Sequence, residues 1–110
     1  MAACNKFSES VLHTACRRST YPVVEFLVNH DADVYITDDY GRCSLHDACW
    51  RLEPDFQIIS LILDKDTNLI WARDQRDFTP LKYIREEHYM YWCIFLYEKR
   101  DKYWPKDALK

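Results

Sequence analysis

The stretch Asp39-Tyr-Gly-Arg-Cys-Ser-Leu-His-Asp-Ala-Cys-Trp50 decides the fold, because its central part recurs in the chain. Its core at residues 45–49 echoes Leu-His-Thr-Ala-Cys at residues 12–16, so that Leu45 lies 33 positions after Leu12. A weaker echo, Thr-Pro-Leu-Lys-Tyr-Ile at residues 79–84, places Leu81 36 positions after Leu45. Self-similarity at this period is typical of units that cannot bury their apolar side alone and therefore stack. The pattern predicts three such units.

This period, with Leu-His-x-Ala at the centre of the unit, resembles the ankyrin repeat, whose signature is Thr-Pro-Leu-His-x-Ala. The resemblance covers about residues 7–97 and implies an all-α solenoid of helix-turn-helix pairs with short extended finger loops. It implies one domain over residues 1–105, with repeats at about 5–37, 38–73 and 74–105 and a loose tail at 106–110. The third repeat is expected to be a degenerate C-terminal cap. The chain start is either a frayed end or the stub of an upstream unit in a longer array.

The composition indicates an ordinary globular domain. With 110 residues, of which 48% are apolar and 30% charged, the chain is long enough for one domain and lies far from the disordered class. The net charge of −3 gives no reason to expect a nucleic acid as partner. No apolar run approaches the length of a membrane span, and the first residues lack the order of a signal peptide. We therefore expect a cytoplasmic or nuclear monomer that binds neither nucleic acid nor membrane, with free and mostly buried cysteines.

The order of apolar and capping residues predicts the helices. First helices are expected at about residues 10–18, 44–51 and from 79 onward, and second helices at about 23–30, 56–63 and 89–100, with a finger at 68–74. Thr79 is expected to cap its helix, with Pro80 at the first helical position. Four apolar residues of the first and last helices are expected in the core, namely Val11, Tyr89, Trp92 and Phe95.

The scarcity of glycine sets a problem for the turns. Ankyrin repeats usually place a glycine at positive φ after the second helix, whereas the only glycine in this sequence is Gly41. The first repeat is therefore expected to use Asp31 there, with Asn29 or His30 as alternatives. The second repeat offers Asp66 or Thr67 for the same role.

The resemblance also implies structural roles. In ankyrin repeats the histidine of Leu-His-x-Ala braces the turn ahead of its own helix, a position that His13 and His46 occupy, whereas the third repeat has Lys82. The residues expected to hold the stack together are Leu12, His13, Ala15, Gly41, Leu45, His46, Ala48, Thr79, Pro80 and Leu81.

The same resemblance implies a concave binding surface, made of finger tips and the exposed side of the first helices. Carried over by position, this surface comprises Arg17, Arg18, Asp39, Tyr40, Arg42, Trp50, Arg51, Gln75, Arg76 and Phe78, together with Lys6, Phe7, Glu9, Glu86 and Glu87. Tyrosine, tryptophan and arginine dominate the hot spots of protein interfaces. Trp50 has a second interpretation, in which it covers a neighbouring repeat. The expected function is a non-catalytic module that binds another protein.

Two pairs, His13-x-x-Cys16 and His46-x-x-Cys49, suggest an alternative, a thiol- or zinc-dependent regulatory protein. Each pair shares one helix face, but a single repeat position used twice also explains both, and stacked helices lie too far apart for two pairs to share one ion. Cys43 with His46 would form a nucleophile pair, yet it lacks an orienting third group and a glycine-rich oxyanion element. The sequence contains no phosphate-binding loop and no Gly-x-Ser-x-Gly elbow. We expect no enzyme activity, no metal and no cofactor.

Overall fold

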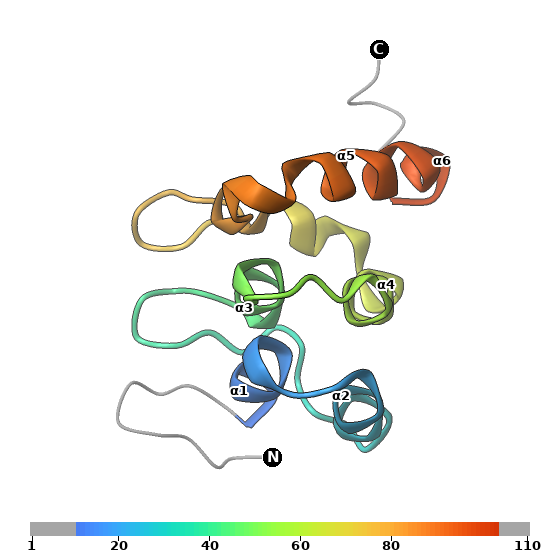
Figure 1. Ribbon diagram of the computed structural model, residues 1–110. Helices are drawn as coiled ribbons and strands as arrows, with labels where there is room; N and C mark the ends of the chain where they lie inside the picture. The colour runs from blue at the N-terminus through green and yellow to red at the C-terminus, as the bar shows by residue number, and fades with distance from the viewer. Residues whose placement is uncertain (1–10, 104–110) are drawn as a thin grey trace.

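The computed structural model describes residues 11–103, which form helices stacked in pairs (Figure 1). No β-strand occurs in this range, and the predicted all-α class of helix-turn-helix pairs is confirmed. None of the helices found between residues 11 and 103 is long and apolar enough to cross a bilayer. In chain order the elements, with η for a 3₁₀-helix, are α1 (Val11–Arg18), α2 (Tyr21–Asn29), α3 (Ser44–Trp50), α4 (Phe56–Lys65), η1 (Thr67–Trp71), η2 (Pro80–Tyr83), η3 (Glu86–His88), α5 (Tyr89–Glu98) and α6 (Arg100–Tyr103).

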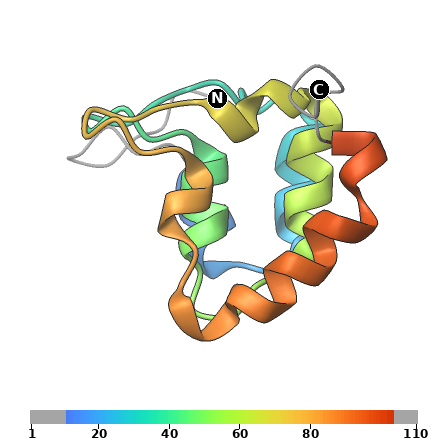
Figure 2. The ribbon, with the colours of Figure 1, turned by 90° about the horizontal axis from the view of Figure 1, so that it is seen from above.

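The elements form two layers. In the inner layer α1 packs on α3, and α3 packs on η2; in the outer layer α2 packs on α4. The outer layer continues to α5 through Phe56, whose ring lies 5.1 Å from that of Trp92 and 4.7 Å from that of Phe95. Seen from above, the loops that connect the units project to one side of these layers (Figure 2). We call α1 and α2 the first helix pair, α3 and α4 the second helix pair, and η2 with α5 the third unit.

One apolar core runs along the stack between the two layers. Leu12 and Leu45 are 2% and 1% exposed and belong to the same buried cluster, and Leu81 packs against that cluster while staying partly exposed. Full burial of a leucine stabilises a fold by about 1.5–3 kcal/mol. The repeated leucines therefore occupy successive levels of one core. Leu81 contributes less to the stability of the fold than Leu12 and Leu45, because the third unit is less covered.

The ends of the helices follow from a few polar residues. Pro22 lies in the first turn of α2, where its missing N–H leaves no hydrogen bond unmade. Helix α2 ends in a Schellman motif, because the amide of Ala32 donates to the carbonyl of Leu27 at 3.0 Å while Asp31 adopts φ 67°. Asp31 thus takes the place of glycine, as expected. Asp55 caps α4 by accepting a hydrogen bond from the amide of Gln57 at 3.0 Å.

The second positive-φ position differs from the prediction. Asp66 has φ −163°, which is extended backbone, and caps η1 by accepting the amide of Asn68 at 2.9 Å. Thr67 is the first residue of η1, so a 3₁₀-helix occupies the start of the predicted finger. Besides Asp31, the aspartate with positive φ among residues 11–103 is Asp77, at φ 66° in the following turn, where it corresponds to Gly41 of the preceding unit.

The third unit also departs from the prediction. Pro80 begins a helix, but η2 ends after a single 3₁₀ turn, and the side chain of Thr79 makes no capping hydrogen bond. In α5 the rings of Trp92 and Phe95 are buried as expected, whereas Tyr89 is 52% exposed. The expectation of a buried residue at the start of α1 is wrong as well, because Val11 is 39% exposed. Both errors fall on terminal turns of helices, where a neighbouring element covers only part of the surface.

Candidate partner-binding surface

The loop at residues 38–42, which we call the Asp38 turn, is built around one carboxylate. Oδ1 of Asp38 accepts the backbone amides of Tyr40 and Arg42 at 2.9 Å each, and Oδ2 accepts Nε of Arg42 at 2.8 Å. The amide of Asp38 donates to the carbonyl of Arg42 at 3.0 Å, which closes the turn. Gly41 has φ 77°, a conformation that side chains disfavour. These bonds orient Tyr40 and Arg42 from a fixed backbone.

The loop at residues 74–78, the Asp74 turn, repeats this arrangement 36 positions later. Oδ1 of Asp74 accepts the amides of Arg76 and Phe78 at 2.9 Å each, and Oδ2 accepts the hydroxyl of Tyr83. Burial by itself raises the pKa of the Asp74 carboxyl, but the hydrogen bonds that it accepts outweigh burial and lower that pKa. Burial and the bond to Asp74 raise the pKa of Tyr83 to about 12. The turn therefore holds a carboxylate against a neutral phenol.

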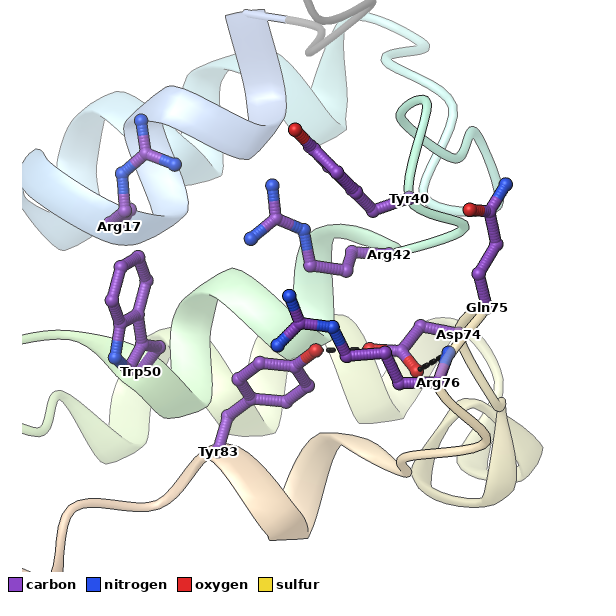
Figure 3. A pocket seen from close by; sticks show the side chains of 8 residues that line it. All are labelled: Arg17, Tyr40, Arg42, Trp50, Asp74, Gln75, Arg76 and Tyr83. Atoms are coloured by element: carbon purple, nitrogen blue, oxygen red, sulfur yellow. Dashed lines mark hydrogen bonds between the residues drawn. The ribbon is translucent and has the colours of Figure 1, made fainter.

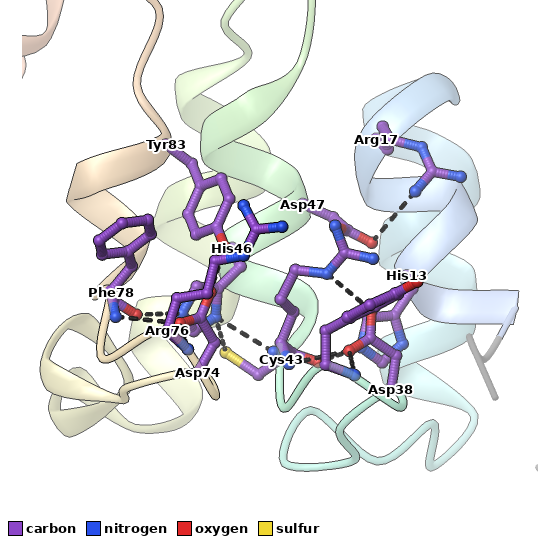
Figure 4. Close-up of polar contacts among 12 residues, drawn as sticks. His13, Arg17, Asp38, Cys43, His46, Asp47, Asp74, Arg76, Phe78 and Tyr83 are labelled. Carbon is purple, nitrogen blue, oxygen red and sulfur yellow. Dashed lines mark hydrogen bonds and ion pairs between the residues drawn. The ribbon is translucent and has the colours of Figure 1, made fainter. Parts of the chain in front are cut away.

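Helices α1 and α3 of the inner layer each carry one histidine that joins the helix to the turn of the next unit (Figure 4). Nε2 of His13 lies 2.7 Å from the carbonyl of Arg42, and Nε2 of His46 lies 3.0 Å from the carbonyl of Phe78. Nδ1 of His46 accepts the amide of Cys43 at 3.1 Å, so Nε2 carries the proton and donates to Phe78. Burial lowers the pKa of His46, which favours this neutral form. His46 thus braces the turn ahead of its own helix and also the turn of the following unit.

Two hollows open on the inner side of the stack. The first, which we call the finger hollow, encloses about 660 Å³ and is lined by Arg17, Tyr40, Arg42, Trp50, Asp74, Gln75, Arg76 and Tyr83 (Figure 3). The second, the helix-end hollow, encloses about 520 Å³ and is lined by Arg17, Arg18, Trp50, Arg51, Leu52, Glu53 and Arg85. They share Arg17 and Trp50, so the two hollows adjoin at these two side chains.

Two residues that line the hollows, Trp50 and Arg51, also make contacts between neighbouring units of the stack. Trp50 is 40% exposed, and the guanidinium of Arg85 lies 5.6 Å from the centre of its ring. The terminal nitrogen of Arg51 donates to the carbonyls of Cys16 and Ser19 at 2.9 and 2.8 Å, at the C-terminal end of α1. Trp50 is therefore partly covered by Arg85, which lies between η2 and α5, and partly exposed; its role in binding a partner stays a prediction. Arg51 serves first as a brace between the two helix pairs.

The structure gathers most of the residues that position alone assigned to the surface. Arg17, Arg18, Tyr40, Arg42, Trp50, Arg51, Gln75 and Arg76 line one or both hollows. Asp39, Phe78, Glu86 and Glu87 line neither, and Lys6, Phe7 and Glu9 lie outside the described residues. Sequence reasoning missed Asp74, Tyr83, Leu52, Glu53 and Arg85. The spacing of 36 between Asp38 and Asp74 was the available signal for one of them.

The His-x-x-Cys pairs do not converge on one point. His13 and His46 each direct Nε2 to a carbonyl of the next turn, while Cys16 and Cys49 lie in the apolar core. Burial raises the pKa of both thiols well above the ordinary value, which opposes thiolate formation. Sγ of Cys43 lies 3.2 Å from Nδ1 of His46, and burial raises the pKa of Cys43 too. Among residues 11–103, no three or more His, Cys, Asp or Glu side chains are grouped to hold a metal ion.

Comparison with known protein families places this architecture. The family model described as "Ankyrin repeats (3 copies)" matches residues 1–74, and no curated protein matches the chain. The matched range contains both helix pairs, η1 and the start of the Asp74 turn, and the same construction of turn and helix continues beyond it. Since the match covers well over half of the sequence and the described residues stack as helix-turn-helix units, this chain belongs to the ankyrin repeat family.

Proposed function

We propose that this chain is a non-catalytic module that binds a partner protein through the finger hollow, the helix-end hollow and the tips of the turns beside them. Ankyrin repeats generally act as protein–protein interaction modules, and the family is typically non-catalytic. The observation that carries the proposal is the meeting of aromatic and arginine side chains, Arg17, Tyr40 and Trp50 among them, around two adjoining hollows.

The exposure of the aromatic rings supports a binding role. Tyr40 and Trp50 are 45% and 40% exposed, so each keeps a large accessible area while the rest of its surface packs against the protein. Partly buried rings of this kind lose little conformational freedom on binding and provide large contact areas. The carboxylate-centred turns and the two histidines fix the backbone beneath them, and a surface fixed in advance binds with a smaller entropic loss.

The test is capture of partners from extract of the native cell, with quantitative mass spectrometry of the retained proteins. Trp50→Ala and Tyr40→Ala should each reduce the stoichiometric capture of the same protein at least about tenfold, since hot-spot residues contribute about 2 kcal/mol or more. Tyr91→Ala is the matched control, because Tyr91 is an exposed aromatic residue on α5 that lines neither hollow. Far-ultraviolet circular dichroism should show that all three variants stay folded. Full retention of the partner by both Trp50→Ala and Tyr40→Ala would reject this surface.

A further inference from the structure

The arginines of this chain are unevenly distributed. The sequence has eight arginines and seven lysines. Six of the eight arginines line the finger hollow or the helix-end hollow: Arg17, Arg18, Arg42, Arg51, Arg76 and Arg85. No lysine among residues 11–103 lines either of them. Arginine presents a planar fork of donors that matches a carboxylate, whereas lysine acts as a point charge. The selection of arginine over lysine at this concavity points to recognition by paired hydrogen bonds.

Three of the acidic groups next to these arginines lie beneath the surface. The side chain of Asp38 is 0% exposed and that of Asp47 is 1% exposed, and Asp74 is 8% exposed as a residue. Asp38 and Asp74 are engaged by the amides of their own turns, and Asp47 lies 3.7 Å from the nearer terminal nitrogen of Arg17. Glu53 is the exposed carboxylate among the residues that line the two hollows. Three carboxylates, those of Asp38, Asp47 and Asp74, are thus buried, while the side chains of Arg17 and Arg42 keep 18% and 17% of their surface exposed and that of Arg76 is exposed.

Aromatic rings hold two of these guanidinium groups in place. The guanidinium carbon of Arg42 lies 4.8 Å from the centre of the Tyr40 ring, and that of Arg85 lies 5.6 Å from the centre of the Trp50 ring. Arg42 is bound to Asp38 through Nε, and within residues 11–103 its two terminal nitrogens make no hydrogen bond, so they can serve another acceptor. Figure 3 shows the guanidinium groups of Arg17, Arg42 and Arg76 around the same opening, beside the rings of Trp50 and Tyr83. Donors fixed in this way bind an acceptor with little loss of side-chain entropy.

We infer that the occupant of this surface is a carboxylate-rich peptide segment of the partner protein, with an aromatic or aliphatic residue that packs on Trp50. This inference rests on the function proposed above and specifies the chemistry of the partner. The net charge of the whole chain is −3, so the cationic concavity is a local feature of an acidic protein. That balance suits a short acidic segment, which enters between the arginines, better than a long polyanion, whose flanks would meet negative charge.

The experiment measures fluorescence anisotropy of three labelled peptides that have equal length and one central tryptophan. Their remaining positions are mainly Glu, Gln or Lys. The Glu peptide should bind at least about tenfold more tightly than the Gln peptide, and more tightly still than the Lys peptide, because charge complementarity is worth several kcal/mol against like-charge contact. Its affinity should fall when salt rises to about 0.15 M. Equal binding of the Glu and Gln peptides would overturn the inference. A labelled phosphoserine peptide and a labelled single-stranded RNA are measured in the same way, and tighter binding of either one than of the Glu peptide would also overturn it.

A charge-reversal pair locates the effect. In Arg76→Glu the altered side chain is exposed and, within the described chain, forms no ion pair, so the fold should persist. Arg100→Glu makes the same change of net charge at an exposed site on α6, outside both hollows. Arg76→Glu should weaken binding of the Glu peptide at least about tenfold, and Arg100→Glu less than about twofold. Equal losses in the two variants would show a non-specific charge effect and would overturn the inference.

The two proposals fail in different ways. A partner whose capture depends on Trp50 but is unchanged by salt and by Arg76→Glu would leave the binding surface in place and remove its acidic occupant. A partner retained in full by both Trp50→Ala and Tyr40→Ala would remove the surface itself, whatever the Glu peptide does. Circular dichroism of each variant separates both results from loss of folding.

Discussion

The second helix pair and the third unit both begin with a carboxylate-centred turn followed by an inner helix, but that helix is shorter and less buried in the third unit. In α3 every residue from Ser44 to Cys49 is buried, and His46 connects two turns. In η2 the helix lasts one turn, and Lys82, in the position of the histidine, is exposed with its ammonium group 5.7 Å from the centre of the Phe78 ring. The turns that lead into the two units are nevertheless almost identical in their hydrogen bonds. The hydrogen bonds of the turn are therefore independent of the length of the helix that follows it.

The largest difference should appear when the same core leucine is removed from both units. Leu45→Ala should lower the free energy of unfolding by about 2–5 kcal/mol, since Leu45 is 1% exposed and its loss leaves a cavity. Leu81→Ala should have a smaller effect, because Leu81 is partly exposed and its surroundings can relax. Urea unfolding followed by circular dichroism measures both. Equal losses would mean that the third unit is as fully packed as the second.

The sequence was sufficient for the periodic part of this comparison. Leu12 and Leu45 recur with the unit, and a repeating apolar position has to face the shared core. Asp31 was predictable too, because helix α2 needs a left-handed residue and aspartate tolerates that conformation. Asp66 was wrongly assigned because it serves as a cap for η1, and a short 3₁₀-helix has no periodicity to reveal it.

The position of a residue in the repeat was enough to predict many residues of the candidate site, but not all the side chains that lie next to them. Arg17, Arg42 and Trp50 follow from where the repeat places finger tips and inner helices. Tyr83 and Arg85 could not be placed, because their location depends on the early end of η2 and the path of the chain after it. Such a path is set by packing between units and leaves no local pattern. Whether these residues bind a partner stays a prediction.

The next comparison exchanges the residues at positive φ in the two turns. Gly41→Asp should destabilise the fold by about 1–2 kcal/mol or more, because a side chain adopts this conformation unfavourably. A Cβ at Gly41 would also lie 3.1 Å from the amide nitrogen of Gln75, which donates to the carbonyl of Tyr40. Thermal unfolding of Gly41→Asp and Gly41→Ala checks this. Wild-type stability in both would show that the Asp38 turn does not depend on its glycine.

The reverse exchange, Asp77→Gly, should change stability by less than about 1 kcal/mol. Glycine relieves the strain at φ 66°, but its flexibility in the unfolded chain opposes the gain. The ion pair between Arg73 and Asp77 would be lost, and both side chains are more than half exposed, so its contribution is about 0–1 kcal/mol. Asp77→Asn is the matched control, since it removes the ion pair and keeps a residue that tolerates this conformation. A loss above about 2 kcal/mol in Asp77→Gly would contradict this balance.

The dependence of stability on pH should reveal the contribution of His46 in the second helix pair, a position that Lys82 occupies in the third unit. The pKa of His46 is lowered in the folded protein, so the unfolded chain takes up a proton first as the pH falls below about 6.5. Stability should therefore decline from about pH 6.5 downward until the folded pKa is passed, by at most about 1.4 kcal/mol per pH unit. Asp38, Asp74 and Arg42 also act on His46, but the stabilising effect of the Asp74 carboxylate is lost only below about pH 3.8. Urea unfolding of wild type and His46→Gln at a series of pH values measures the difference. An identical slope in both proteins would exclude His46 as its source.

The smallest effect should come from the outward face of α5, which bounds the third unit. Ile94 is 52% exposed, whereas its neighbour Phe95 is 8% exposed and packs on Phe56. Ile94→Lys should therefore shift the free energy of unfolding by no more than about 0.5 kcal/mol, because the side chain already meets solvent. Phe95→Ala at the adjacent position is the positive control and should lower stability by about 3–5 kcal/mol. Sedimentation of wild type and Ile94→Lys adds a second readout. A large loss of stability, or a change of mass in solution, on introducing a single lysine would mean that this face of α5 is covered in the dissolved protein. The third unit would then be more open than the second only in appearance.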